Sequence, residues 1–161
     1  MFILIGGVMK KLSIYFLIIL CLFITGCGED KEKVVVTVNE FDMVLANKGF
    51  TVTDNMSTYS DADYILEAKK AVLDDVEIEF IKYSNSDYAK KVQDKQIENF
   101  ILLKSTGAHE KKEEGNNYYK YFLVSNNRYM INTRVDDTLM FCKTMLEDKE
   151  IVEEVFEELG Y

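Results

Sequence analysis

The sequence has few of the side chains that most often carry catalysis or bind metals. Its 161 residues include one histidine and three cysteines. It contains no His-Glu-x-x-His motif and no paired histidines, so it matches no common zinc-binding pattern. It also contains no Gly-rich nucleophile elbow. The sequence therefore predicts no catalytic residues, no metal and no cofactor, and favours a non-catalytic binding or interaction module.

Basic residues are too few to balance the acidic ones. The chain has 19 Lys and Arg against 28 Asp and Glu, which gives a net charge of −9. Proteins that bind nucleic acid or anionic surfaces through a broad electrostatic field carry the opposite charge. Nucleic acid is therefore excluded as an expected partner.

No hydrophobic run has the length of a membrane-spanning helix. The uncharged stretch 12–24 has 13 residues, whereas a transmembrane helix needs about 20. It follows Met9-Lys10-Lys11 and leads into Ile24-Thr25-Gly26-Cys27. A basic segment, a hydrophobic segment and a site of small residues, in this order, are typical of a secretory signal peptide.

The cysteine directly after Gly26 makes this signal resemble the lipobox of bacterial lipoproteins, formed here by Ile24, Thr25, Gly26 and Cys27. The resemblance implies that residues 1–26 are removed and that the Cys27 thiol carries a diacylglyceryl group. Residues 27–38 then form a charged tether. We therefore expect the protein on the extracytoplasmic face of the cell membrane, anchored by its lipid.

Two further expectations concern the start of the chain and its host. Residues 1–8 are apolar and precede the basic pair, which is unusual in a signal peptide, so the true start is predicted to be Met9. The composition, rich in Lys, Asn, Ile and Tyr, is typical of a Gram-positive-type host.

The chain that remains after cleavage has the size of one domain. Removal of residues 1–26 leaves 135 residues. It takes away two lysines and no acidic residue, so the net charge of −9 becomes −11. Cys21 leaves with the signal and Cys27 is lipidated, so Cys142 stays alone and no disulfide is predicted. A lone cysteine among apolar neighbours is most often a core residue.

Hydrophobic periodicity predicts a single α+β domain over residues 39–161. A short helix starts at Asn39, and three strands are expected over residues 50–53, 64–71 and 76–83. A longer helix starts at Ser86. The segment that follows is charged and is predicted to be a solvated loop; it contains His109, Glu110, Glu113 and Glu114.

The second half contains the strongest hairpin signal. Residues 118–125 and 128–135 flank Asn126-Asn127, and asparagine tolerates the positive φ that a type I′ turn requires. A third strand over 138–144 and a final helix capped by Asp148 complete the domain. The predicted fold is a twisted antiparallel sheet of about six strands with helices packed on it, in the order α-β-β-β-α-β-β-β-α.

This mature region resembles small surface lipoproteins of Gram-positive-type bacteria that end in such hairpins. The residues that carry the resemblance are 118–138 and 158–161. The resemblance implies no particular activity.

Strand pairing across the two turns assigns side chains to the faces of the sheet. One face is predicted to be core and includes Cys142. The other mixes aromatic, amide and guanidinium groups, a composition typical of interface hot spots. Its candidate binding residues are Tyr119, Tyr121, Asn132, Arg134 and Phe141, with Arg128 and Lys143 near the turn end. Two interpretations remain: this face binds a partner, or another helix, such as 39–48, covers it.

Three functional classes follow from these observations. The favoured one is a lipid-anchored module that binds a protein partner or a small ligand at the cell surface. A cell-envelope hydrolase is the first alternative, with Asp61 and Asp63, or Glu77 and Glu79, as the paired carboxylates that such chemistry needs. An immunity-like or inhibitory lipoprotein is the second alternative.

Overall fold

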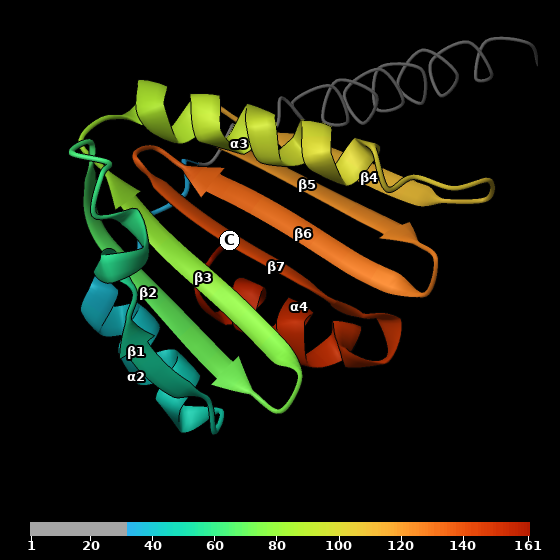
Figure 1. Cartoon of the computed structure of the whole chain (residues 1–161), viewed down its shortest axis with the longest axis horizontal. Helices are drawn as coiled ribbons and strands as arrows, with labels where there is room; N and C mark the ends of the chain where they lie inside the picture. The colour runs from blue at the N-terminus through green and yellow to red at the C-terminus, as the bar shows by residue number, and fades with distance from the viewer. Residues whose placement is uncertain (1–31) are drawn as a thin grey trace, which may run out of the picture. The chain divides into compact units, whose positions relative to one another are not determined.

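The computed structural model describes residues 32–161, which are coloured in Figure 1. The predicted signal peptide and lipobox, with Ile24, Thr25, Gly26 and Cys27, lie outside these residues. Within residues 32–161, no helix has both the length and the apolar character needed to cross a membrane.

Seven antiparallel strands form one sheet, in the order β1-β2-β3-β7-β6-β5-β4. The strands are β1 (Thr51–Asp54), β2 (Ile65–Leu73), β3 (Val76–Tyr83), β4 (His109–Glu114), β5 (Tyr118–Ser125), β6 (Arg128–Val135) and β7 (Thr138–Met145). The strands β1 to β3 form one meander and β4 to β7 another, and the pairing of β3 with β7 joins them. The predicted α+β class with an antiparallel sheet is confirmed.

The predicted count of about six strands is wrong, because the charged segment for which the sequence predicts a loop contains the strand β4. Its sequence, His-Glu-Lys-Lys-Glu-Glu, has no apolar alternation, yet it pairs with β5 along its whole length. It is an edge strand that is exposed at nearly every position. Charge on such a strand discourages pairing with other chains and removes the usual strand pattern. The order of elements is therefore α-β-β-β-α-β-β-β-β-α.

The hairpin turns are confirmed residue by residue. Asn126 and Asn127 have φ of 52° and 58°, as a type I′ turn requires. Ser125 pairs with Arg128 across this turn. At the next turn Asp136 has φ of 48°. The faces of β5, β6 and β7 are therefore those that the sequence predicted.

The helices are α2 (Val38–Asn47), α3 (Ser86–Ile101) and α4 (Lys149–Glu158), with short 3₁₀ segments η1 (Met56–Tyr59) and η2 (Leu146–Asp148). Thr37, not Asn39, caps α2, because its hydroxyl and the Glu40 side chain form a reciprocal capping box. Asn85 caps α3 in place of Ser86. Asp148 is the N-cap of α4, as predicted, but its carboxylate accepts from the Thr144 hydroxyl at 3.0 Å and not from the helix backbone.

Helices cover both faces of the sheet: α2 and α4 pack on one side and α3 on the other (Figure 1). The larger core lies under α2 and α4 and is mostly apolar; it includes Phe41, Leu45, Ile78, Phe80, Ile131, Met140, Cys142, Val155 and Phe156. On the other side α3 buries Ile97 and Phe100 against Tyr121, Leu123 and Met130.

The segment before α2 belongs to the folded unit. Val36 is 7% exposed and lies in the larger core. The backbone amide of Lys33 donates to Asn117 Oδ1 at 3.0 Å, and Asn117 Nδ2 donates to the Lys33 carbonyl at 2.8 Å. The fold therefore begins before Asn39. The chain enters it beside the first residue of β5.

The Asn126-Asn127 turn provides a test of the hairpin. Replacing Asn127 by valine should lower the free energy of unfolding by about 1–2 kcal/mol, since a left-handed backbone places Cβ too close to the next carbonyl oxygen. Urea unfolding measures the change. Asn127→Gly is the matched control and should unfold at the same or higher urea concentration. A valine variant as stable as the parent would contradict the turn assignment.

Candidate functional site

The face proposed from the sequence as a binding surface is covered by a helix. Tyr121 and Asn132 are fully buried, and Tyr119, Arg134 and Phe141 are half-buried. The covering helix is α3; the segment 39–48 that was suggested for this role lies mainly in α2, on the opposite face. The five residues do share one face. Because α3 packs on it, this face is not an open partner surface.

A polar network explains why amide and guanidinium groups lie under α3. Gln93 Nε2 donates to Asn132 Oδ1 at 2.9 Å and to the Tyr119 carbonyl at 2.9 Å. Asn132 Nδ2 donates to Gln96 Oε1, and Arg134 Nε donates to Gln93 Oε1 at 3.3 Å. Buried polar groups cost free energy unless they are hydrogen-bonded, so this network fixes α3 on the sheet.

Tyr121 is engaged in a second structural contact. Its hydroxyl donates to Glu110 Oε2 at 2.8 Å, and Lys104 Nζ lies 3.1 Å from Glu110 Oε1. The hydrogen bond from Tyr121 lowers the pKa of Glu110 below its ordinary value, with a further contribution from Lys104. The contact ties the edge strand β4 to β5 and to the segment after α3.

Cys142 is a core residue, as expected from its neighbours in sequence. It is 1% exposed in the larger core. Burial raises the pKa of its thiol to about 12. The thiolate is the reactive form of cysteine, and at neutral pH it is almost absent here. His109, on β4, stacks on Phe122 with ring centres 5.9 Å apart.

Of the carboxylates proposed for hydrolysis, Glu77 and Glu79 bind neighbouring side chains, and Asp61 and Asp63 are exposed. Glu79 accepts from the Tyr59 hydroxyl at 2.6 Å and from Asn55 Nδ2 at 3.2 Å. Glu77 pairs with Lys70 at 2.7 Å. Asp61 and Asp63 are exposed in the turns before β2. Among residues 32–161, no three His, Cys, Asp or Glu side chains gather closely enough to hold a metal ion.

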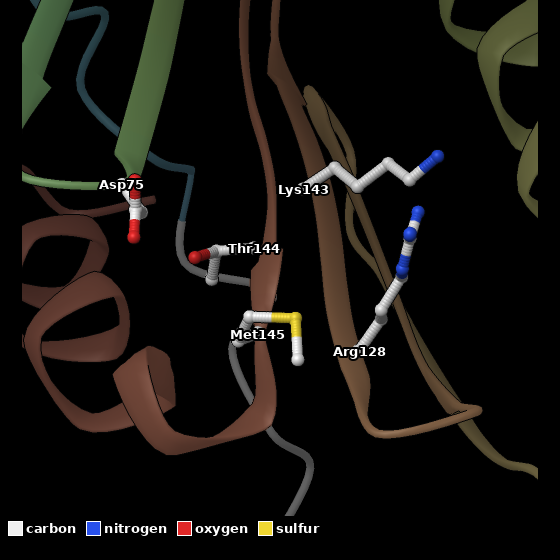
Figure 2. A pocket seen from close by; sticks show the side chains of 5 residues that line it. All are labelled: Asp75, Arg128, Lys143, Thr144 and Met145. Carbon is white, nitrogen blue, oxygen red and sulfur yellow. The ribbon is translucent and has the colours of Figure 1, made fainter.

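Two cationic side chains lie together at the far end of the same face. Arg128 pairs with Met145, and Met130 with Lys143, so Arg128 and Lys143 are diagonal neighbours on β6 and β7. Figure 2 shows both side chains extending on the same side of β7, with their charged ends close together, while Asp75 and Thr144 lie on the other side of this strand.

These two cations belong to the basic residues of 32–161 that form no ion pair. Seven lysines of residues 32–161 form ion pairs with carboxylates, and neither Arg128 nor Lys143 is among them. Like charges that face each other across neighbouring strands repel. Asp75 lines a hollow beside them but forms no ion pair with either cation.

Shallow hollows flank Arg128. One, of about 210 Å³, is lined by Asp75, Arg128, Lys143, Thr144 and Met145 (Figure 2). The other, of about 340 Å³, is lined by Leu103, Ser125, Asn126, Arg128 and Met130. We call Arg128, Lys143 and these two hollows the turn-end basic site. Its guanidinium fork and ammonium group have the geometry to bind a carboxylate or a phosphate.

Sequence reasoning placed Arg128 and Lys143 at the turn end but did not select them as a site. The register from the Asn126-Asn127 turn shows that they are neighbours. What it does not show is which carboxylates reach them, because that depends on the packing of α3 and of the loop after it.

Comparison with known proteins adds little to this description. No family model matches the chain, and no curated protein matches it. Among solved structures, a GTP-binding regulator from Thermotoga maritima is similar at 15% sequence identity and a TM-score of 0.47. The match covers 78% of this chain and 88% of that one. A similarity this weak carries no argument about function.

The contact between Tyr121 and Glu110 predicts a measurable pKa change. In Tyr121→Phe the pKa of Glu110 should rise toward its ordinary value, because the lost hydrogen bond is the largest cause of the lowered pKa. Because the pKa of Glu110 is lower in the folded state than in the unfolded state, its ionised form stabilises the fold at pH values above the unfolded pKa. This stabilisation is lost as the pH falls through the folded-state pKa. The stability difference between parent and variant should therefore shrink in acid.

NMR titration of the Glu110 carboxyl carbon measures the pKa, and urea unfolding at pH 7 and pH 3 measures the stability difference. Tyr88→Phe is the matched control, since Tyr88 is 39% exposed and stacks on Tyr64 far from Glu110. An unchanged Glu110 pKa in Tyr121→Phe would show that the hydrogen bond does not form in solution.

Proposed function

We propose that this chain is a lipid-anchored binding module on the extracytoplasmic face of the cell membrane, and that it holds an anionic group of its partner at the turn-end basic site. The observation that carries the proposal is that Arg128 and Lys143 are diagonal neighbours and form no ion pair among residues 32–161. Two neighbouring cations repel each other, so an anion that binds between them relieves this repulsion.

Anchoring rests on the lipobox-like sequence before Cys27. Two acyl chains hold a protein stably on a bilayer, where a single chain does not. Six residues lead from Cys27 to Lys33 and reach at most about 20 Å. The folded unit therefore stays close to the membrane surface.

The energetics indicate that the anion is one part of a larger contact. Exposed ion pairs contribute about 0–1 kcal/mol each. Two such interactions correspond at most to a dissociation constant of about 30 mM for a free anion. A partner held specifically at this site must add contacts beyond its charge.

The alternatives draw less support from the described residues. A hydrolase would need an activated nucleophile or a poised pair of acids, while Cys142 is buried with a raised pKa and Glu77 and Glu79 are held by Lys70, Tyr59 and Asn55. An immunity-like role would use the same basic site and differs only in the identity of the partner.

The anchoring is tested by Cys27→Ser. In cells fed radiolabelled palmitate, the parent should carry the label and migrate as the cleaved form, while the variant should carry none and keep its signal, because only the thiol accepts the diacylglyceryl group. Cys142→Ser is the matched control and should be labelled normally. A Cys27→Ser protein that is still labelled or processed would contradict lipid anchoring.

The basic site is tested with inorganic phosphate. The lipidated protein, methyl-labelled at methionine and held in nanodiscs of zwitterionic lipid, should show saturable NMR shifts of the Met145 methyl group with a dissociation constant of about 30 mM. The double variant Arg128→Ala, Lys143→Ala should lose these shifts. A double variant of two exposed lysines on α3, Lys90→Ala, Lys91→Ala, should keep them. Shifts that persist without Arg128 and Lys143 would refute the site.

A further inference from the structure

We infer that the turn-end basic site takes an acidic peptide segment whose acidic residue is flanked by apolar side chains. This inference rests on the proposed function and names the class of partner. It is carried by the apolar surface around Arg128 and by the charges that face it.

Exposed apolar side chains gather next to the two cations. Leu103 is 40% exposed and Met145 39%. Leu103 and Met130 line the larger hollow together with Arg128, and Met145 lies opposite Arg128 on β7. Single exposed apolar residues are ordinary on a protein surface, whereas a contiguous group beside a charged site is typical of an interaction surface.

The segment after α3 is held in this position by hydrogen bonds. Ser125, which pairs with Arg128 across the turn, donates from Oγ to the Leu103 carbonyl at 2.9 Å. The Ser105 amide donates to Ser125 Oγ at 3.0 Å. Leu103 and Arg128 are therefore fixed side by side, which lowers the entropy cost of binding a ligand to both.

The partner is expected to approach through side chains and not as an added strand. Both β6 and β7 are interior strands, with a neighbour on each side. Their backbone groups are used within the sheet, so an incoming segment cannot extend it. The features left for recognition are the guanidinium and ammonium groups and the apolar walls of the hollows.

A single acidic residue fits the site better than a polyanion. Asp75 lines the far side of the smaller hollow and would repel a second negative group. The mature chain has a net charge of −11 and would repel a long polyanion over most of its surface. Such polymers also offer no apolar groups for Leu103 and Met145. A short peptide segment meets the cations and the apolar surface together.

The test uses the lipidated protein in zwitterionic nanodiscs with labelled methionine methyl groups. The probes are a blocked Gly-Leu-Glu-Leu-Gly peptide and the same peptide with Ser in place of Leu or Gln in place of Glu. The leucine-glutamate peptide should shift the methyl signals of Met130 and Met145 and leave those of Met43 and Met56 unchanged. It should bind at least tenfold more tightly than either altered peptide.

Variants separate the apolar part of the site from the charged part. Leu103→Ser should weaken peptide binding several-fold and leave phosphate binding intact, whereas Leu66→Ser, at a distant leucine that is 53% exposed, should change neither. The double variant Arg128→Ala, Lys143→Ala should lose both.

Two results would overturn the inference while the proposed anion site stands. One is tighter binding of inorganic tripolyphosphate than of the peptide, with no effect of Leu103→Ser. The other is binding of phosphatidylglycerol vesicles by the anchored protein through Arg128 and Lys143. Failure of phosphate as well as peptide to shift Met145 would instead refute the proposed function itself.

Discussion

The antiparallel pairing of β3 with β7 is the interaction on which the rest of the structure depends. It joins two meanders that are separate in sequence, with Ile78 opposite Cys142 and Ile81 opposite Leu139. Without it, β3 and β7 would each be an edge strand with unpaired backbone groups. Each meander alone would provide only half of the apolar surface on which the helices pack. The joined sheet is wide enough for α2 and α4 to share one side and for α3 to cross the other.

The same pairing determines where function can lie. It brings the β2–β3 turn, with Asp75, beside β7. The helix α3 covers Tyr121 and Asn132, and the segment after this helix is hydrogen-bonded to Ser125 through Leu103. The helix α3 covers the part of this face that holds the hydrogen-bonded network of Gln93 and Asn132. The other end of the face is open, and there Arg128 and Lys143 form no ion pair within residues 32–161. A binding role fits the open end, because the charged groups under α3 already have partners.

The covered face illustrates why composition alone does not locate a site. Aromatic, amide and guanidinium groups are enriched at interfaces, and the same groups occur wherever a polar network fixes a helix on a sheet. Asn132 and Arg134 belong to the second case because Gln93 and Gln96 reach them from α3. Gln93 and Gln96 are distant in sequence from Asn132 and Arg134. Only the packed structure therefore distinguishes an interface from a polar network under a helix.

The sequence by itself determined the hairpins, the register and the core face, because positive φ at Asn126 and alternation along β5 and β6 are local properties. It did not reveal β4, whose charged residues pair with β5 through backbone groups that carry no side-chain signature. Only the tertiary structure decided which helix covers which face. It also decided that Arg128 and Lys143 stay open, since both depend on contacts between distant segments.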